Sequence, residues 1–212
     1  MARRTVFAVL SVAAMGAGVL VGCGAMYAAR PDDSAAKAAA MLKSSFVDRG
    51  QAKLDRLDQD ETQRLCTEAT SRAPSREVAA KIEQVNLASI KWPGDGKWMG
   101  DWKNGEKIAQ EGRGLQYSDD PAGPVGANCY ACHQLTRQEV SYGTIGPSLY
   151  QFGKLRGYGA DIQKYAYGKV YNAEAYAACT NMPRFGHRGI LTEAQIKDVV
   201  ALLMDPESPV NK

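Results

Sequence analysis

One short motif constrains this chain more than any other feature of its sequence. Residues 129–133 read C-Y-A-C-H, the C-x-x-C-H pattern through which c-type haem is attached to protein. The two sulfurs add across the vinyl groups of the porphyrin, and the histidine that follows lies beneath the iron. Only five cysteines and two histidines occur in the 212 residues, so a chance match would be rare. The motif predicts one covalent haem c on Cys129 and Cys132, with His133 as an axial iron ligand.

Two other interpretations of the motif are open. A zinc site would need a second Cys/His pair at suitable spacing, but the remaining Cys66, Cys179 and His187 are scattered along the chain. A thioredoxin-like redox pair would lie in a βαβ pattern, and no such pattern surrounds these residues. The sequence favours haem attachment.

The N-terminus has the pattern of an export signal. Arg3 and Arg4 precede an apolar run over residues 6–21 that is short for a membrane span. Residues 20–23 read L-V-G-C, which fits the lipoprotein cleavage box with Cys23 as the lipidated residue, although an ordinary cleavage site nearby would also fit. We expect a signal peptide over residues 1–23 and a periplasmic location. Lipidation of Cys23 would add a membrane anchor.

The remaining sequence divides into a helical extension over residues 24–93 and a cytochrome c domain over 94–212. Apolar periodicity and turn residues predict helices over residues 35–47, 54–65, 78–85, 102–108, 161–167 and 192–204. Thr192 and Gln195 have the spacing of a capping box at the start of the last helix. No convincing sheet pattern is present. The fold class is therefore all-α, a cytochrome c fold with an N-terminal helical extension.

Two cysteines remain once the haem and signal residues are assigned. In an oxidising compartment, Cys66 and Cys179 are most simply interpreted as a disulfide, which would close a loop of roughly a hundred residues and contribute about 4–5 kcal/mol. The alternative is a free thiol that reacts or ligates.

The formal net charge is +3 and falls toward zero when the two signal arginines are removed, which argues against a nucleic-acid partner.

The second axial ligand should lie well downstream of His133. Met182, in the segment N-M-P-R-F-G over residues 181–186, is the best candidate, because its neutral thioether favours ferrous iron. A purely core-filling role for Met182 and ligation by His187 are the alternatives. The carbonyl of Pro147 is expected to accept the free ring N–H of His133 and to fix its tautomer. Both axial positions would then be filled, which favours electron transfer over bond-making chemistry.

Four segments together resemble a known family. Residues 128–135 (NCYACHQL), 143–149 (GTIGPSL), 182–186 (MPRFG) and the C-terminal run from Gly189 to Asn211 are similar to SoxX, the monohaem subunit of the SoxAX cytochromes of bacterial thiosulfate oxidation. The likeness covers about half the chain, mainly from Trp98 onward. The extension matches only loosely.

The resemblance implies a role that spacing alone does not. SoxA would carry the catalytic haem and join thiosulfate oxidatively to a cysteine of the SoxYZ carrier. This chain would be the non-catalytic electron-transfer subunit of that heteromeric L-cysteine S-thiosulfotransferase, passing electrons to a small periplasmic cytochrome c. A free-standing electron carrier is the first alternative. A catalytic haem enzyme, with Cys179 near the iron, is the second.

Overall fold

The computed structural model describes residues 33–69 and 73–212. Across these residues the chain is helical, and its only strand-like feature is an isolated bridge between Arg49 and Ala52. The predicted all-α class is confirmed. None of the described helices combines the length and apolar character needed to cross a membrane. The expected signal peptide, with Arg3, Arg4 and Cys23, lies outside the described residues.

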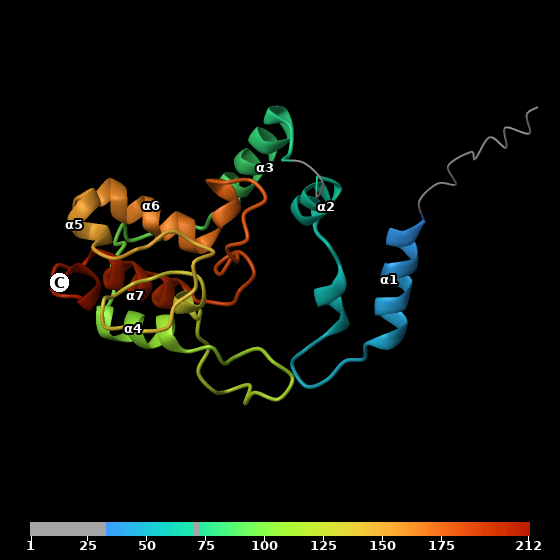
Figure 1. Cartoon of the computed structure of the whole chain (residues 1–212), viewed down its shortest axis with the longest axis horizontal. Helices are drawn as coiled ribbons and strands as arrows, with labels where there is room; N and C mark the ends of the chain where they lie inside the picture. Colours follow the sequence, from blue (N-terminus) through green and yellow to red (C-terminus); the bar gives the residue numbers. More distant parts are fainter. Residues whose placement is uncertain (1–32, 70–72) are drawn as a thin grey trace, which may run out of the picture. The chain divides into compact units, whose positions relative to one another are not determined.

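The described segments contain the following helices, drawn in Figure 1: α1 (Ser34–Ser45), η1 (Leu54–Leu57), α2 (Glu61–Glu68), α3 (Arg76–Ala88), α4 (Trp102–Gln110), η2 (Cys129–Ala131), α5 (Phe152–Arg156), α6 (Ala160–Tyr171), η3 (Ala173–Ala175), α7 (Glu193–Met204) and η4 (Pro209–Asn211). The η elements are short 3-10 helices. The described residues divide into two units between Ala40 and Met41, and the second unit runs to Lys212. The features described below belong to the second unit.

Helices α4 and α7 lie side by side in this unit (Figure 1). The predicted capping box at the start of α7 is present: the Gln195 N–H donates to the Thr192 hydroxyl, and the Thr192 N–H donates to Gln195 Oε1. The apolar positions of α7 are buried in the core. A Cβ on Gly105 of α4 would overlap the backbone of Asp198 in α7, so the glycine permits a close helix crossing.

Helix α3 docks on the part of the unit formed by α6 and η3. Ile82 is buried at 2% exposure, and the buried Asn86 accepts a 2.9 Å hydrogen bond from Asn172 Nδ2 through its side-chain oxygen. The same Asn172 Nδ2 also lies 3.0 Å from Ser89 Oγ. Because this buried hydrogen bond joins α3 to the junction of α6 and η3, it fixes α3 to that segment of the chain.

Several helix boundaries differ from the predictions. The single helix expected over residues 54–65 is two elements, η1 and α2. The Asp60 carboxylate accepts from the Gln63 N–H, and the Asp60 N–H donates to Gln63 Oε1, so a capping box begins α2 afresh at Glu61. Helix α1 starts and ends one to two residues earlier than expected, α6 extends beyond residues 161–167 at both ends, and α5 was not predicted.

Candidate haem site

The C-x-x-C-H segment forms one tight 3-10 turn. The preceding Asn128 has a left-handed φ of 43°, and the backbone N–H groups of Cys132 and His133 both donate to the Cys129 carbonyl, at 3.1 and 2.9 Å. Neither Cys129 nor Cys132 is part of a disulfide, and both are partly buried. The turn thus presents two thiols and an imidazole from five consecutive residues.

The environment of Cys129 suits a neutral sulfur. Burial raises the pKa of its thiol to about 12, so a thiolate would be disfavoured there. A thioether to a porphyrin carries no charge and meets no such cost. Cys129 also packs against the edge of the hydrophobic core, where a flat apolar macrocycle would be buried favourably.

His133 is oriented by the loop that follows the motif. Its Nδ1–H donates to the Pro147 carbonyl oxygen at 2.7 Å, which leaves the lone pair of Nε2 available for a metal. A Cβ on Gly146 would overlap the imidazole ring. The Gly146 and Gly143 N–H groups donate to the Cys132 and Tyr130 carbonyls, so the loop is tied back onto the motif.

Met182 lies in the loop between η3 and α7. Its side chain is half-buried against the same hydrophobic core that Cys129 contacts. Farther along the loop, Phe185 is buried, and the N–H groups of Gly186 and His187 both donate to the Tyr171 carbonyl at 3.0 Å. The loop therefore presents its methionine from a segment that is anchored at its far end.

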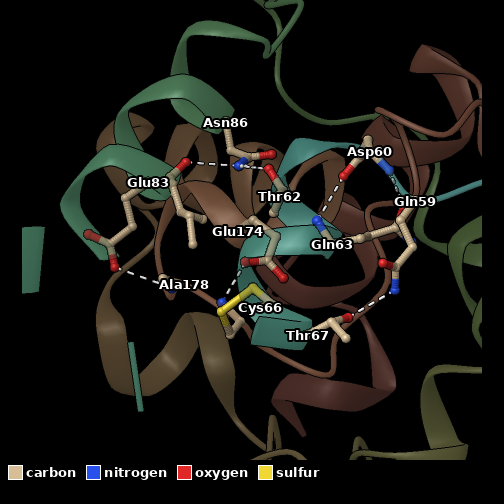
Figure 2. The surroundings of a disulfide bond; sticks show 12 residues. Gln59, Asp60, Thr62, Gln63, Cys66, Thr67, Glu83, Asn86, Glu174 and Ala178 are labelled. Atoms are coloured by element: carbon tan, nitrogen blue, oxygen red, sulfur yellow. Dashed lines mark hydrogen bonds between the residues drawn. A yellow bond between two sulfur atoms is a disulfide. The ribbon is translucent and has the colours of Figure 1, made fainter. Parts of the chain in front are cut away.

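The structure brings Cys66 and Cys179 together in a disulfide with an S–S distance of 2.08 Å (Figure 2). The bond joins α2 to the start of the Met182 loop. Cys179 therefore carries no free thiol that could ligate iron. His187, the other alternative ligand, is exposed, and its Nδ1 lies 3.2 Å from the Ser89 hydroxyl at the end of α3.

Sequence reasoning did not find an ion-pair network beside this disulfide. Arg184, buried at 8% exposure, donates to Asp60 Oδ2 at 2.6 Å, and Arg188 also reaches this oxygen, at 3.0 Å. Arg188 also donates to Gln63. The only sequence signal in this set was the Asp60–Gln63 capping-box spacing. The pairing of Asp60 with Arg184 joins residues 124 positions apart, which no local pattern can predict.

Two carboxylates in this region have shifted pKa values. For Asp60, burial alone would raise the pKa, but hydrogen bonds from the Gln63 N–H and Arg184, with the charges of Arg184 and Arg188, outweigh it and lower the pKa. For Glu174, burial dominates and raises the pKa, although its carboxylate accepts from the Cys179 N–H at 2.6 Å. Of these two carboxylates, Asp60 is therefore the one whose ionised form is stabilised by its surroundings.

Comparison with known proteins gives the family. The cytochrome c family model matches residues 123–205. A protein of Aquifex aeolicus (strain VF5), described as an uncharacterized lipoprotein, is 39% identical over 157 residues, which is 73% of this chain and 73% of the relative. The chain contains a cytochrome c domain. It is a c-type cytochrome, and its predicted cytochrome c fold with helices before the domain is confirmed.

A cytochrome c domain implies covalent haem c, and the residues present fit that group. When bound, the haem supplies an iron that accepts and donates one electron. Cys129 and Cys132 would hold it covalently, while the Pro147 carbonyl keeps His133 in the tautomer that can bind metal. Within residues 33–69 and 73–212, no group of three His, Cys, Asp or Glu side chains is placed to hold a separate metal ion.

Proposed function

We propose that this cytochrome carries electrons through a haem iron whose two axial ligands are His133 and Met182. The observation that carries the proposal is the placement of Met182, half-buried against the same core as Cys129, on a loop tied down by hydrogen bonds and a disulfide. With imidazole on one side and thioether on the other, no coordination position is left for a substrate. Such a site exchanges electrons rather than making bonds.

We further propose that the chain is the monohaem subunit of a SoxAX-type complex. The likeness of the haem motif, the G-P-S loop, the M-P-R-F-G segment and the C-terminal run to SoxX supports this role. Its partners would then be a SoxA-type haem subunit, SoxYZ indirectly, and a small cytochrome c that accepts the electrons. The chain itself would hold no group that handles thiosulfate.

The alternatives differ in how the described residues support them. A catalytic haem with a cysteine ligand would need the Cys179 thiol, which is bonded to Cys66. A free-standing carrier needs only one compact domain. The helices preceding the domain, with α3 docked through Asn86, add surface that a SoxA-type partner could use. The complex subunit therefore remains the function that we propose.

The proposed domain order is a signal peptide over residues 1–23, an extension over 24–93 and the haem domain over 94–212. The Aquifex aeolicus relative is described as a lipoprotein, which supports lipidation of Cys23 and tethering at a periplasmic membrane surface. Lipidated protein should enter the detergent phase of a Triton X-114 extraction. The Cys23→Ser variant, exported by a cleavable signal, should remain in the aqueous phase.

Two measurements test the proposed function. The ferric protein should show the near-infrared charge-transfer band of His/Met haem, and Met182→Ala should abolish it while His187→Ala leaves it in place. A band that survives Met182→Ala would refute the ligand assignment.

Affinity purification from periplasm, followed by haem staining, should recover a second haem polypeptide in stoichiometric amount, whereas purification of the chain alone would favour the free-standing carrier.

A further inference from the structure

A helix outside the matched cytochrome region contacts the methionine loop on both sides of Met182. The family match covers residues 123–205, whereas α2 and its cap occupy residues 60–68. Cys66 of α2 is bonded to Cys179, three residues before Met182. Asp60, the cap of the same helix, pairs with Arg184, two residues after Met182, at 2.6 Å. Figure 2 shows Asp60 and Cys66 on this one short helix.

We propose that Asp60 and Cys66 are positioning residues that keep Met182 on the haem iron, an inference that rests on the proposed axial role of Met182. Neither residue would touch the haem. Each acts through the backbone of the loop, one on either side of the ligand. Helix α2 thus works as an external clamp on the weaker of the two axial ligands.

The clamp depends on a few discrete bonds rather than on packing. No residue of α2 is buried. A hollow of about 910 Å³ lies between the helix and the loop, lined on one side by Gln63 and Cys66 and on the other by Met182 and Pro183. Because little apolar surface joins the two segments, loss of the disulfide or of the ion pair would not be offset by other contacts.

On the upstream side, the disulfide holds a residue in a disfavoured conformation. Cys179 has a φ of 60°, in the left-handed region that residues with side chains rarely adopt. It is kept there by Cys66 and by the bond from its N–H to Glu174. Without the disulfide, this strain can relax, and the relaxation moves the segment that leads to Met182.

On the downstream side, the ion pair holds a buried charge. The Arg184 side chain is 7% exposed, and Asp60 is its carboxylate partner. Removing that carboxylate leaves a guanidinium in the interior without its counter-charge, which favours movement of residue 184 toward water. The cap position allows a variant that removes only the charge, because asparagine caps a helix as well as aspartate does but carries no charge.

The expected effect is an increase in the fraction of ferric protein in which Met182 has left the iron. Exogenous imidazole binds only that fraction, so its apparent affinity rises in proportion to it. We expect Asp60→Asn and the double variant Cys66→Ala/Cys179→Ala each to bind imidazole about tenfold more tightly than the parent holoprotein. Loss of the near-infrared band during the titration reports the binding.

The matched control is Glu61→Gln. Glu61 is the neighbour of Asp60 on α2, and its carboxylate pairs with Lys81 of α3 at 2.8 Å instead of with the methionine loop. This variant removes the same charge from the same helix turn and should leave imidazole affinity within twofold of the parent. Far-UV circular dichroism checks that every variant retains its helices.

The outcomes separate this inference from the ligand assignment. If the parent protein lacks the band, the axial role of Met182 fails. If the parent shows the band but Asp60→Asn binds imidazole no more tightly than Glu61→Gln does, the clamp is refuted while the ligand assignment stands. Should the double cysteine variant not mature, reduction and alkylation of the disulfide in purified holoprotein, followed by reoxidation of the haem, supplies the same comparison.

Discussion

At Gly146, next to His133, there is no room for a side chain. A Cβ there would overlap the imidazole ring, while the next residue, Pro147, accepts the ring N–H through its carbonyl. The ring is thus positioned by a close contact with Gly146 and by a hydrogen bond to Pro147. Both constraints come from the loop that follows the motif and not from the motif itself.

We therefore predict that Gly146→Ala displaces His133 and destabilises the holoprotein by about 1–3 kcal/mol, the usual cost of overpacking. Urea unfolding, monitored through the Soret absorbance of the haem, measures this change in stability. Gly94→Ala is the matched control, because a Cβ at Gly94 meets nothing within 4 Å. Equal stability of the two variants would show that the loop yields without disturbing the histidine.

The ionisation of Asp60 makes its contribution to stability depend on pH. Its folded-state pKa lies below the ordinary value of 3.8, so its stabilising contribution is complete above that value and is lost as the pH falls through the folded pKa. We predict that Asp60→Asn lowers the free energy of unfolding by about 1–3 kcal/mol at pH 7, and that the difference from the parent shrinks below pH ~4. Urea unfolding at several pH values tests this. A stability difference that does not change with pH would show that it does not arise from the ionised Asp60 carboxylate.

At the scale of elements, apolar periodicity was a good guide where a helix buries one face. The predicted α7, with its capping box, and α4, with its small residue at the crossing, both occur. Helix α3 was also expected, although Val85, within the predicted range, is exposed. The stretch that pattern alone assigned to one helix, and that divides into η1 and α2, has no buried residue. The short α5 was missed although Phe152 is buried.

The α4–α7 crossing gives a prediction of its own. Gly105→Ala should destabilise the protein by about 1–3 kcal/mol, although alanine favours helix, because its Cβ would overlap the backbone of Asp198. Denaturant unfolding of the holoprotein measures the change. Asn104→Ala, at the exposed neighbouring position, should be neutral or slightly stabilising. A stable Gly105→Ala protein would mean that the two helices can move apart at little cost.

At the scale of the whole molecule, the sequence indicated the chemistry of the haem site better than the contacts that hold it. The C-x-x-C-H motif and the cysteine count pointed to the residues that the structure places at the turn and in the disulfide. The Asp60–Arg184 pair and the placement of α2 beside the methionine loop depend on tertiary packing, because residues more than a hundred positions apart meet there. Such pairs leave no trace in local spacing.

The disulfide should contribute to global stability. It spans 113 residues, and the chain-entropy relation assigns such a loop about 4–5 kcal/mol. We predict a loss of that order in Cys66→Ala/Cys179→Ala, measured by urea unfolding. Thiol labelling of unfolded, unreduced protein lacking Cys23 should detect neither cysteine. Labelling of either one would overturn the pairing.

The long span of this disulfide also imposes an order on biogenesis. In the export that we propose, Cys66 leaves the translocation channel well before Cys179, so for that interval its natural partner is absent while Cys129 and Cys132 emerge between them. Four thiols allow six different single disulfides, and only the Cys66–Cys179 bond leaves both haem-binding sulfurs reduced. Oxidative folding and cofactor ligation therefore compete for the same thiols, and a cell that makes this cytochrome must delay or correct the first reaction until the second is complete.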